Sequence, residues 1–227
     1  MKTHSITLSP HEVRAALRGE LSLVVRPVKP QPDRQDKTGR WTFCVSSSHQ
    51  GDEDKWSYSI VDPDGHLYTD RGRETRLLSL RCPLGGPGDR LAGKETWAHD
   101  APSLTECRWR YEDIMGGLPG YGPYYQADPV HENAGLRWRS PATMPAWASR
   151  ITLENCGVRV MRLAEITEED ARATGVTGDC PIGHIPSYQK GPFAYHFAQE
   201  WESRYGKRYP WESSPWVWAA KVKRVEG

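Results

Sequence analysis

Two stretches in the second half of the chain combine basic and aromatic side chains in a pattern typical of nucleic-acid recognition. Trp138 precedes Arg139 and Ser140, and Trp147 lies shortly before Arg150. A guanidinium group donates hydrogen bonds to phosphates and base edges, and an indole ring offers a flat face for base stacking. These residues are therefore candidate ligand contacts. The alternative is that the tryptophans pack in a core while the arginines bond to loops.

A carboxylate and another indole lie close together near the middle of the chain, at Glu95 and Trp97. A carboxylate accepts a hydrogen bond from the exocyclic amino group of a base, so both residues are candidate ligand contacts. A structural ion pair is the alternative for Glu95. In an enzymatic alternative, a rearranged site acts on a modified base or nucleotide through Glu95 and residues of the loop 116–135, such as Tyr124, Tyr125 or His131.

A local basic stretch early in the chain adds two more candidates. Arg26 and Lys29 are followed by further basic residues, which Asp33 and Asp36 interrupt. Cations at this spacing suit a phosphate, and a solvated loop is the alternative. The cysteines and histidines are too loosely spaced for a metal site, so neither a metal nor another cofactor is expected.

The composition limits the class of protein. With 227 residues, we expect a single domain over 1–227. The 30 Lys and Arg residues oppose 29 Asp and Glu residues, so no global field draws the chain to nucleic acid. The 10 Trp and 10 Tyr residues supply large flat side chains for a core and for stacking. Neither a membrane span nor a signal peptide is recognisable, so we expect a cytoplasmic protein.

Short strands and few helices must position these candidates. A capping box predicts a helix over 10–18, Thr167 begins a helix over 168–174, and an apolar face predicts a third over 193–205. Strands are predicted over 21–28, 41–45, 56–61, 66–70, 91–96, 151–154, 157–163 and 216–225, with a hairpin between 56–61 and 66–70. The segment 116–134 is predicted to be an irregular loop. The pattern favours an α+β fold with a small barrel.

Five ordered blocks resemble the ASCH domain, a branch of the PUA-like superfamily, in the long form found in bacteriophages. The blocks lie at 9–32, 87–97, 144–153, 166–175 and 215–218. The resemblance implies a PUA-like small β-barrel with short flanking helices and a cleft that binds RNA, single-stranded nucleic acid, a nucleotide or a modified nucleobase. The stretches at about 44–80 and 111–135 match nothing in the family and are predicted insertions, the first a β-hairpin.

One ASCH branch hydrolyses N4-acetylcytidine, and the resemblance implies that its catalytic set is missing here. That branch uses a lysine and a threonine in the pattern Gly-x-Lys-Thr-x-Thr-x-Arg and a glutamate near the end of a short helix. Gly19 and Arg26 keep the ends of the pattern, but the three catalytic positions are Leu21, Val24 and Thr174. These side chains supply neither a base nor an activated nucleophile for amide hydrolysis.

We therefore expect a non-catalytic protein that binds a nucleobase, nucleotide or single-stranded nucleic acid in the cytoplasm, which is the host's if a phage encodes the chain. The expected ligand-binding residues are Arg26, Lys29, Glu95, Trp97, Arg139, Ser140, Trp147 and Arg150. Two alternatives remain open. One is a hydrolase that acts on a modified nucleoside through a rearranged site, and the other is a phage structural or host-interaction protein.

Overall fold

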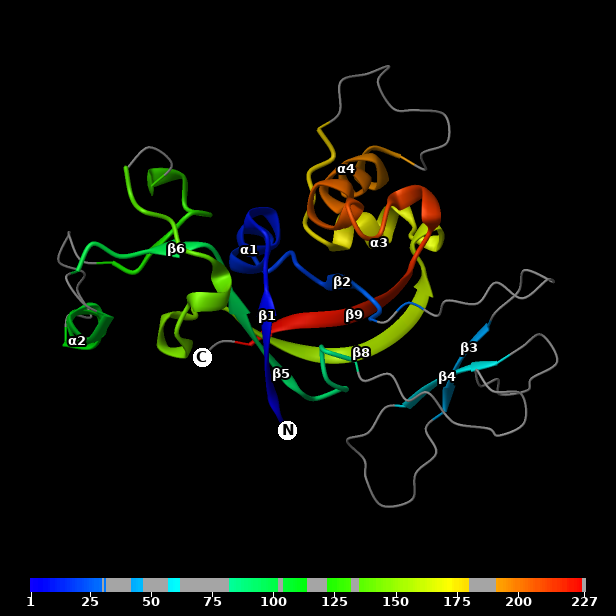
Figure 1. Cartoon of the computed structure of the whole chain (residues 1–227), viewed down its shortest axis with the longest axis horizontal. Coiled ribbons are helices and arrows are strands. Elements are labelled where there is room, and N and C mark those ends of the chain that lie inside the picture. The colour runs from blue at the N-terminus through cyan, green and yellow to red at the C-terminus, as the bar shows by residue number, and fades with distance from the viewer. Residues whose placement is uncertain are drawn as a thin grey trace.

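The computed structural model describes residues 1–29, 31, 42–46, 57–61, 82–101, 104–113, 122–131, 135–179 and 191–225. The predicted insertion at about 44–80 lies largely outside these residues, the one at about 111–135 lies partly outside them, and the predicted strand over 66–70 lies wholly outside them. The described residues form a mixed α+β fold around one five-stranded sheet (Figure 1).

The sheet has the strand order β1-β5-β8-β9-β2. Strand β1 (Thr3–Thr7) runs parallel to β5 (Arg90–Lys94). The remaining pairs are antiparallel and join β5 to β8 (Thr152–Arg162), β8 to β9 (Trp216–Val225), and β9 to β2 (Leu23–Pro27). Strands β1 and β2 are thus the two edges, and no ladder joins them to close a barrel among the described strands.

Strand β2 has apolar residues on both of its faces, and both faces are buried. Val24 packs in a cluster with α1 (Pro10–Leu17), whereas Leu23 and Val25 pack in a second cluster with α3 (Glu168–Ala173) and α4 (Pro192–Trp201). Figure 1 shows α3 and α4 together and α1 beside β1. The sheet therefore has one core on each side.

The helices largely follow the predictions. Reciprocal capping bonds begin α1 and α3, which confirms the helices predicted over 10–18 and 168–174. The helix predicted over 193–205 ends as an α-helix at Trp201 and continues as a π-helical turn over Glu202–Gly206. Helix α2 (Leu104–Asp113) was not predicted. None of the helices in the described ranges is long and apolar enough to cross a membrane.

Strand β8 corrects one prediction, because the two strands expected at 151–154 and 157–163 are a single strand. The register shifts between Asn155 and Gly157, so Cys156 is the extra residue of a β-bulge. Gly157 has a φ of 156°, which glycine tolerates best. The glycine that marked a break in the sequence is thus the site of a bulge within one strand.

Two small sheets lie outside the main one. Strand β3 (Thr42–Ser46) pairs with β4 (Ser57–Val61), and the predicted partner of β4 at 66–70 lies outside the described residues. Strand β6 (Trp97–Ala98) pairs with β7 (Tyr124–Tyr125), which lies in the predicted irregular loop. Short 3-10 helices occur at Pro129–His131, Pro141–Thr143, Ala146–Ala148, Leu163–Glu165 and Trp211–Ser213.

Candidate functional site: a cavity at the sheet seam

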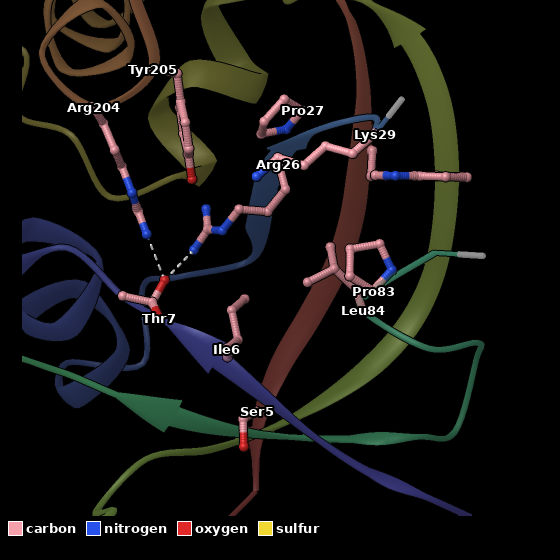
Figure 2. A pocket seen from close by; sticks show the side chains of 11 residues that line it. Ser5, Ile6, Thr7, Arg26, Pro27, Lys29, Pro83, Leu84, Arg204 and Tyr205 are labelled. Atoms are coloured by element: carbon pink, nitrogen blue, oxygen red, sulfur yellow. Dashed lines mark hydrogen bonds between the residues drawn. The ribbon is translucent and has the colours of Figure 1, made fainter. Parts of the chain in front are cut away.

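A cavity of about 560 Å³ opens at the seam between the two edge strands of the sheet. This seam cavity is shown in Figure 2 and is lined by Ser5, Ile6, Thr7, Arg26, Pro27, Lys29, Pro83, Leu84, Arg204, Tyr205 and Trp218. Its volume is in the range of pockets that hold small organic ligands. Both edges therefore contribute to one small-molecule-sized site.

Arg26 spans the seam from β2 to β1. Its guanidinium donates to both carboxylate oxygens of Glu12, at 2.7 and 3.1 Å, and to the carbonyl oxygen of Thr7 at 2.8 Å. It also donates to the carbonyl oxygen of Val25 at 2.8 Å. Four bonds hold this side chain in one orientation, so Arg26 is a fixed part of the cavity wall.

Glu12 is the buried anion behind this wall. It accepts from Arg26, from Arg204 at 3.0 Å and from the backbone N–H of Ser9 at 2.8 Å. Burial alone would raise the pKa of Glu12, but the two guanidinium groups and the hydrogen bonds lower it to about 2. The carboxylate is therefore ionised at neutral pH and holds both arginines.

Positive charge remains in excess around the cavity. Arg26, Arg204 and Lys29 carry three positive charges against the single negative charge of Glu12, which leaves two. Arg204 uses one donor on Glu12 and one on the Thr7 carbonyl oxygen, at 2.7 Å, out of the five that a guanidinium has. The cavity can therefore attract an anionic group and offer it hydrogen bonds.

Part of the remaining cavity wall is apolar and tightly packed. Ile6, Leu84 and Trp218 are at most 4% exposed and belong to the core cluster under α1. The carbonyl oxygen of Leu84 accepts from the Asn155 side chain at 2.8 Å, which fixes the loop before β5. Apolar side chains beside cations suit a ligand that joins a flat ring to an anionic group.

The three positions that the resemblance to the ASCH domain aligns with catalytic residues lie in the core. Leu21, Val24 and Thr174 are at most 3% exposed, and none of them lines the seam cavity. The hydroxyl of Thr174 donates to the carbonyl oxygen of Ala171 at 2.7 Å, so it is used in the C-terminal turn of α3. These side chains serve packing in this chain.

The eight predicted ligand contacts divide between two places. Arg26 and Lys29 line the seam cavity, and the other six lie around the end of β5, outside the cavity lining. Glu95 is 2% exposed and accepts two bonds from Arg150, at 2.9 and 3.0 Å. Arg150 also donates twice to Asp128, at 2.7 and 3.0 Å, and stacks on the ring of Tyr125 at 3.9 Å. This Glu95 cluster has the geometry of a structural ion pair.

The aromatic candidates near this cluster are packed against the protein. Trp97 is fully buried and donates to the Thr143 hydroxyl at 3.3 Å, while Arg139 lies 5.8 Å from its ring centre. Trp147 packs against the same small core. Ser140 accepts from the N–H of Ala142 at 3.3 Å and begins a 3-10 helix. The buried Trp97 ring presents no face to a ligand.

Three groups of the enzymatic alternative, Glu95, Tyr124 and Tyr125, already have partners within the protein. Burial raises the pKa of Glu95, and the bonds from Arg150 oppose that rise. The hydroxyl of Tyr125 donates to the carbonyl oxygen of Ala148 at 2.8 Å, and that of Tyr124 donates to Asp100 at 3.2 Å. The side chain of His131 lies outside the described part of the structure. Within that part, no group of three or more His, Cys, Asp or Glu residues is arranged to hold a metal ion.

Several cavity residues were not among the predictions, namely Ser5, Thr7, Leu84, Arg204, Tyr205 and Trp218. Arg204 follows the apolar face of α4, and Trp218 alternates with Trp216 in β9. Both patterns predict a helix or a strand, but neither predicts a binding site.

No protein-family model, no curated protein and no solved structure matches the chain. The candidate function rests on the chemistry of the cavity.

Proposed function

We propose that the seam cavity binds a nucleotide, a nucleoside that carries phosphate, and does not turn it over. The observation that carries this proposal is the excess of positive charge in a cavity with apolar walls. Arg204 and Lys29 supply the charge, and Ile6, Leu84 and Trp218 supply the walls. A nucleotide has both complementary parts in one molecule.

The phosphate would lie on the cationic side of the cavity. Arg204 keeps donors beyond those that it gives to Glu12 and Thr7, and planar guanidinium groups bind phosphate through paired hydrogen bonds. Lys29 adds a second, flexible cation. Arg26 has four bonds within the protein and acts as a positioning residue, because it fixes Glu12 and the β1 edge.

A mononucleotide fits the charge distribution better than a long nucleic acid. The formal net charge of the chain is only +1, and strong binding of a polyanion needs several lysines and arginines in contact with successive phosphates. The seam cavity offers two accessible cations, Arg204 and Lys29. Any RNA or single-stranded DNA would be bound through one nucleotide in the cavity.

The lining of the cavity supports binding without catalysis. Among the described residues that line it there is no Asp, Glu, His or Cys, so it contains no ready general base or thiol nucleophile. The nearest carboxylate, Glu12, is held by two arginines. A bound nucleotide would be released unchanged.

We also infer that the five-stranded sheet is a PUA-like barrel left open at the seam and that the chain is a single-domain, cytoplasmic, phage-type relative of the ASCH family. The support is the bond from Arg26 of β2 to Thr7 of β1, which brings the two edge strands together. The ordered sequence blocks add to this inference.

Isothermal titration calorimetry with AMP, CMP, GMP and UMP tests the proposed function. We expect at least one nucleotide to bind and the corresponding nucleoside to bind at least about tenfold more weakly, since charged hydrogen bonds to the phosphate are lost. Arg204→Gln should weaken nucleotide binding by a similar factor. Arg208→Gln, at an exposed position in the same segment, is the matched control and should bind normally. If none of the four nucleotides binds, the proposed function is wrong.

A further inference from the structure

We infer that the unpaired main chain of β1 at Ser5 recognises the base, through an edge of the base on which a hydrogen-bond acceptor and a donor lie side by side, such as N1 and the 6-amino group of adenine. This inference rests on the proposed function and extends it to the way the base is held. The hydrogen bonds of the two edge strands determine the direction of their main-chain groups and leave those of Ser5 open to a ligand.

Alternate residues of β1 point toward and away from β5. The N–H of Arg90 donates to the carbonyl oxygen of Lys2, and the N–H of Leu8 donates to the carbonyl oxygen of Lys94, each at 2.8 Å. In a parallel ladder this pattern directs the main-chain groups of the even-numbered residues of β1 to β5. Those of Thr3, Ser5 and Thr7 therefore point to the open side. The bond from Arg26 to the Thr7 carbonyl oxygen confirms this direction.

Ser5 consequently presents both its N–H and its C=O to the seam. It lines the cavity and is exposed, and among the described strands β1 pairs only with β5. The next outward carbonyl group, that of Thr7, already accepts from Arg26 and Arg204. A ligand that enters the cavity therefore meets the complete donor and acceptor pair at Ser5.

The opposite edge offers much less to a ligand. The N–H of Val28 donates to Trp216 at 3.0 Å, so the even-numbered residues of β2 face β9 and the odd-numbered ones face the seam. Of these, Pro27 has no N–H, and the carbonyl oxygen of Val25 accepts from Arg26. Pro27, which lines the cavity, can therefore offer only its C=O, and the complete donor and acceptor pair of the seam cavity is on β1.

The pair at Ser5 matches a particular kind of base edge. In an extended residue the N–H and C=O groups lie side by side and point in the same direction, so they complement an acceptor next to a donor. Adenine and cytosine present such an edge with a ring nitrogen and an amino group, and guanine and uracil present one with a carbonyl oxygen and a ring N–H, so the pair at Ser5 can bind each of them. With the phosphate on Arg204 and Lys29, such a base can reach the β1 edge from within the cavity.

The variant Ser5→Pro tests the inference, because proline removes the outward N–H and leaves the bonds to β5 intact. Thr3→Pro is the matched control, since Thr3 is another outward residue of β1 and does not line the cavity. We expect Ser5→Pro to bind AMP about tenfold more weakly than the wild type, and Thr3→Pro to bind it normally. Both variants should bind ribose 5-phosphate as the wild type does, because that ligand has no base.

Two results distinguish this inference from the proposed function. If the wild type binds AMP and folded Ser5→Pro binds it equally well, the role of Ser5 is wrong and the proposed function stands. If the wild type binds no nucleotide, both fail. Should Ser5→Pro not fold, wild-type protein decides: N6,N6-dimethyl-AMP, which has lost both amino donors, should bind about tenfold more weakly than AMP. Equal binding of the two would overturn the inference.

Discussion

Arg26 in β2 donates a hydrogen bond of 2.8 Å to the carbonyl oxygen of Thr7 in β1, so a side chain links the two edges of the sheet where no main-chain ladder does. The same guanidinium holds the buried carboxylate of Glu12. One residue thus stabilises the core under α1 and keeps the seam at a fixed width. The cavity exists because the strands meet at this bond and leave the rest of the seam open.

Arg26→Gln should destabilise the protein by about 3 kcal/mol, because removing one partner of a buried ion pair leaves Glu12 incompletely compensated. Arg18→Gln is the control, since Arg18 pairs with Glu20 on the surface and should contribute little. Urea unfolding followed by tryptophan fluorescence measures both. Equal midpoints for the two variants would contradict a structural role for Arg26.

Glu12 should make stability fall at acidic pH. Its folded pKa of about 2 lies below the ordinary value of 4.5, so its stabilising effect is complete above about pH 4.5 and is lost as the pH falls toward 2. The shift corresponds to roughly 3 kcal/mol at neutral pH. Unfolding free energies measured between pH 6 and pH 2.5 should show this loss in the wild type, and Glu12→Gln should show a smaller loss. Parallel pH profiles would show that Glu12 is not the titrating group.

Leu21, which the resemblance to the ASCH domain aligns with a catalytic lysine, should not tolerate a charged side chain. Leu21→Lys places an ammonium group at a site that is 3% exposed and is expected to cost several kcal/mol. Ser22→Lys, one residue later and exposed, should be nearly neutral. Thermal unfolding of the two variants gives the comparison. A fully stable Leu21→Lys protein would mean that this position opens to water.

The Glu95 cluster should affect stability and not ligand binding. Arg150→Gln leaves the buried Glu95 without its donor and should destabilise by about 3 kcal/mol, while nucleotide affinity in the folded variant stays within about twofold of the wild type. Arg139→Gln, on an exposed arginine, is the control for stability. A large loss of affinity in Arg150→Gln would move the binding site to this cluster.

Local patterns predicted most of the secondary structure. The capping residues Ser9 and Thr167 marked helix starts that the structure confirms, because a cap and its first turn involve only neighbouring residues. Strand β1 escaped prediction, since Thr3–Thr7 has a single buried apolar residue, Ile6. Its place in the sheet depends on its pairing with β5, far along the chain.

The candidate site was predictable only in small part, for the same reason. Arg26 and Lys29 were found because they lie three residues apart in a basic stretch. Arg204 was missed because it lies 192 residues from Glu12, the carboxylate that holds it. Glu12 itself was assigned only to the capping box of α1, and it does accept from Ser9. Its second role, as the anchor of two arginines, depends on how distant elements pack.

Nuclear magnetic resonance of isotope-labelled protein titrated with AMP tests whether the seam cavity binds a nucleotide, because it locates the bound ligand. We predict that the signals of the Ser5 and Thr7 amides and of the Trp218 indole shift with nucleotide, and that those of Trp97 and Arg139 stay unchanged. Shifts confined to Trp97, Arg139 and their neighbours, with the signals of the seam residues unchanged, would contradict nucleotide binding in the seam cavity.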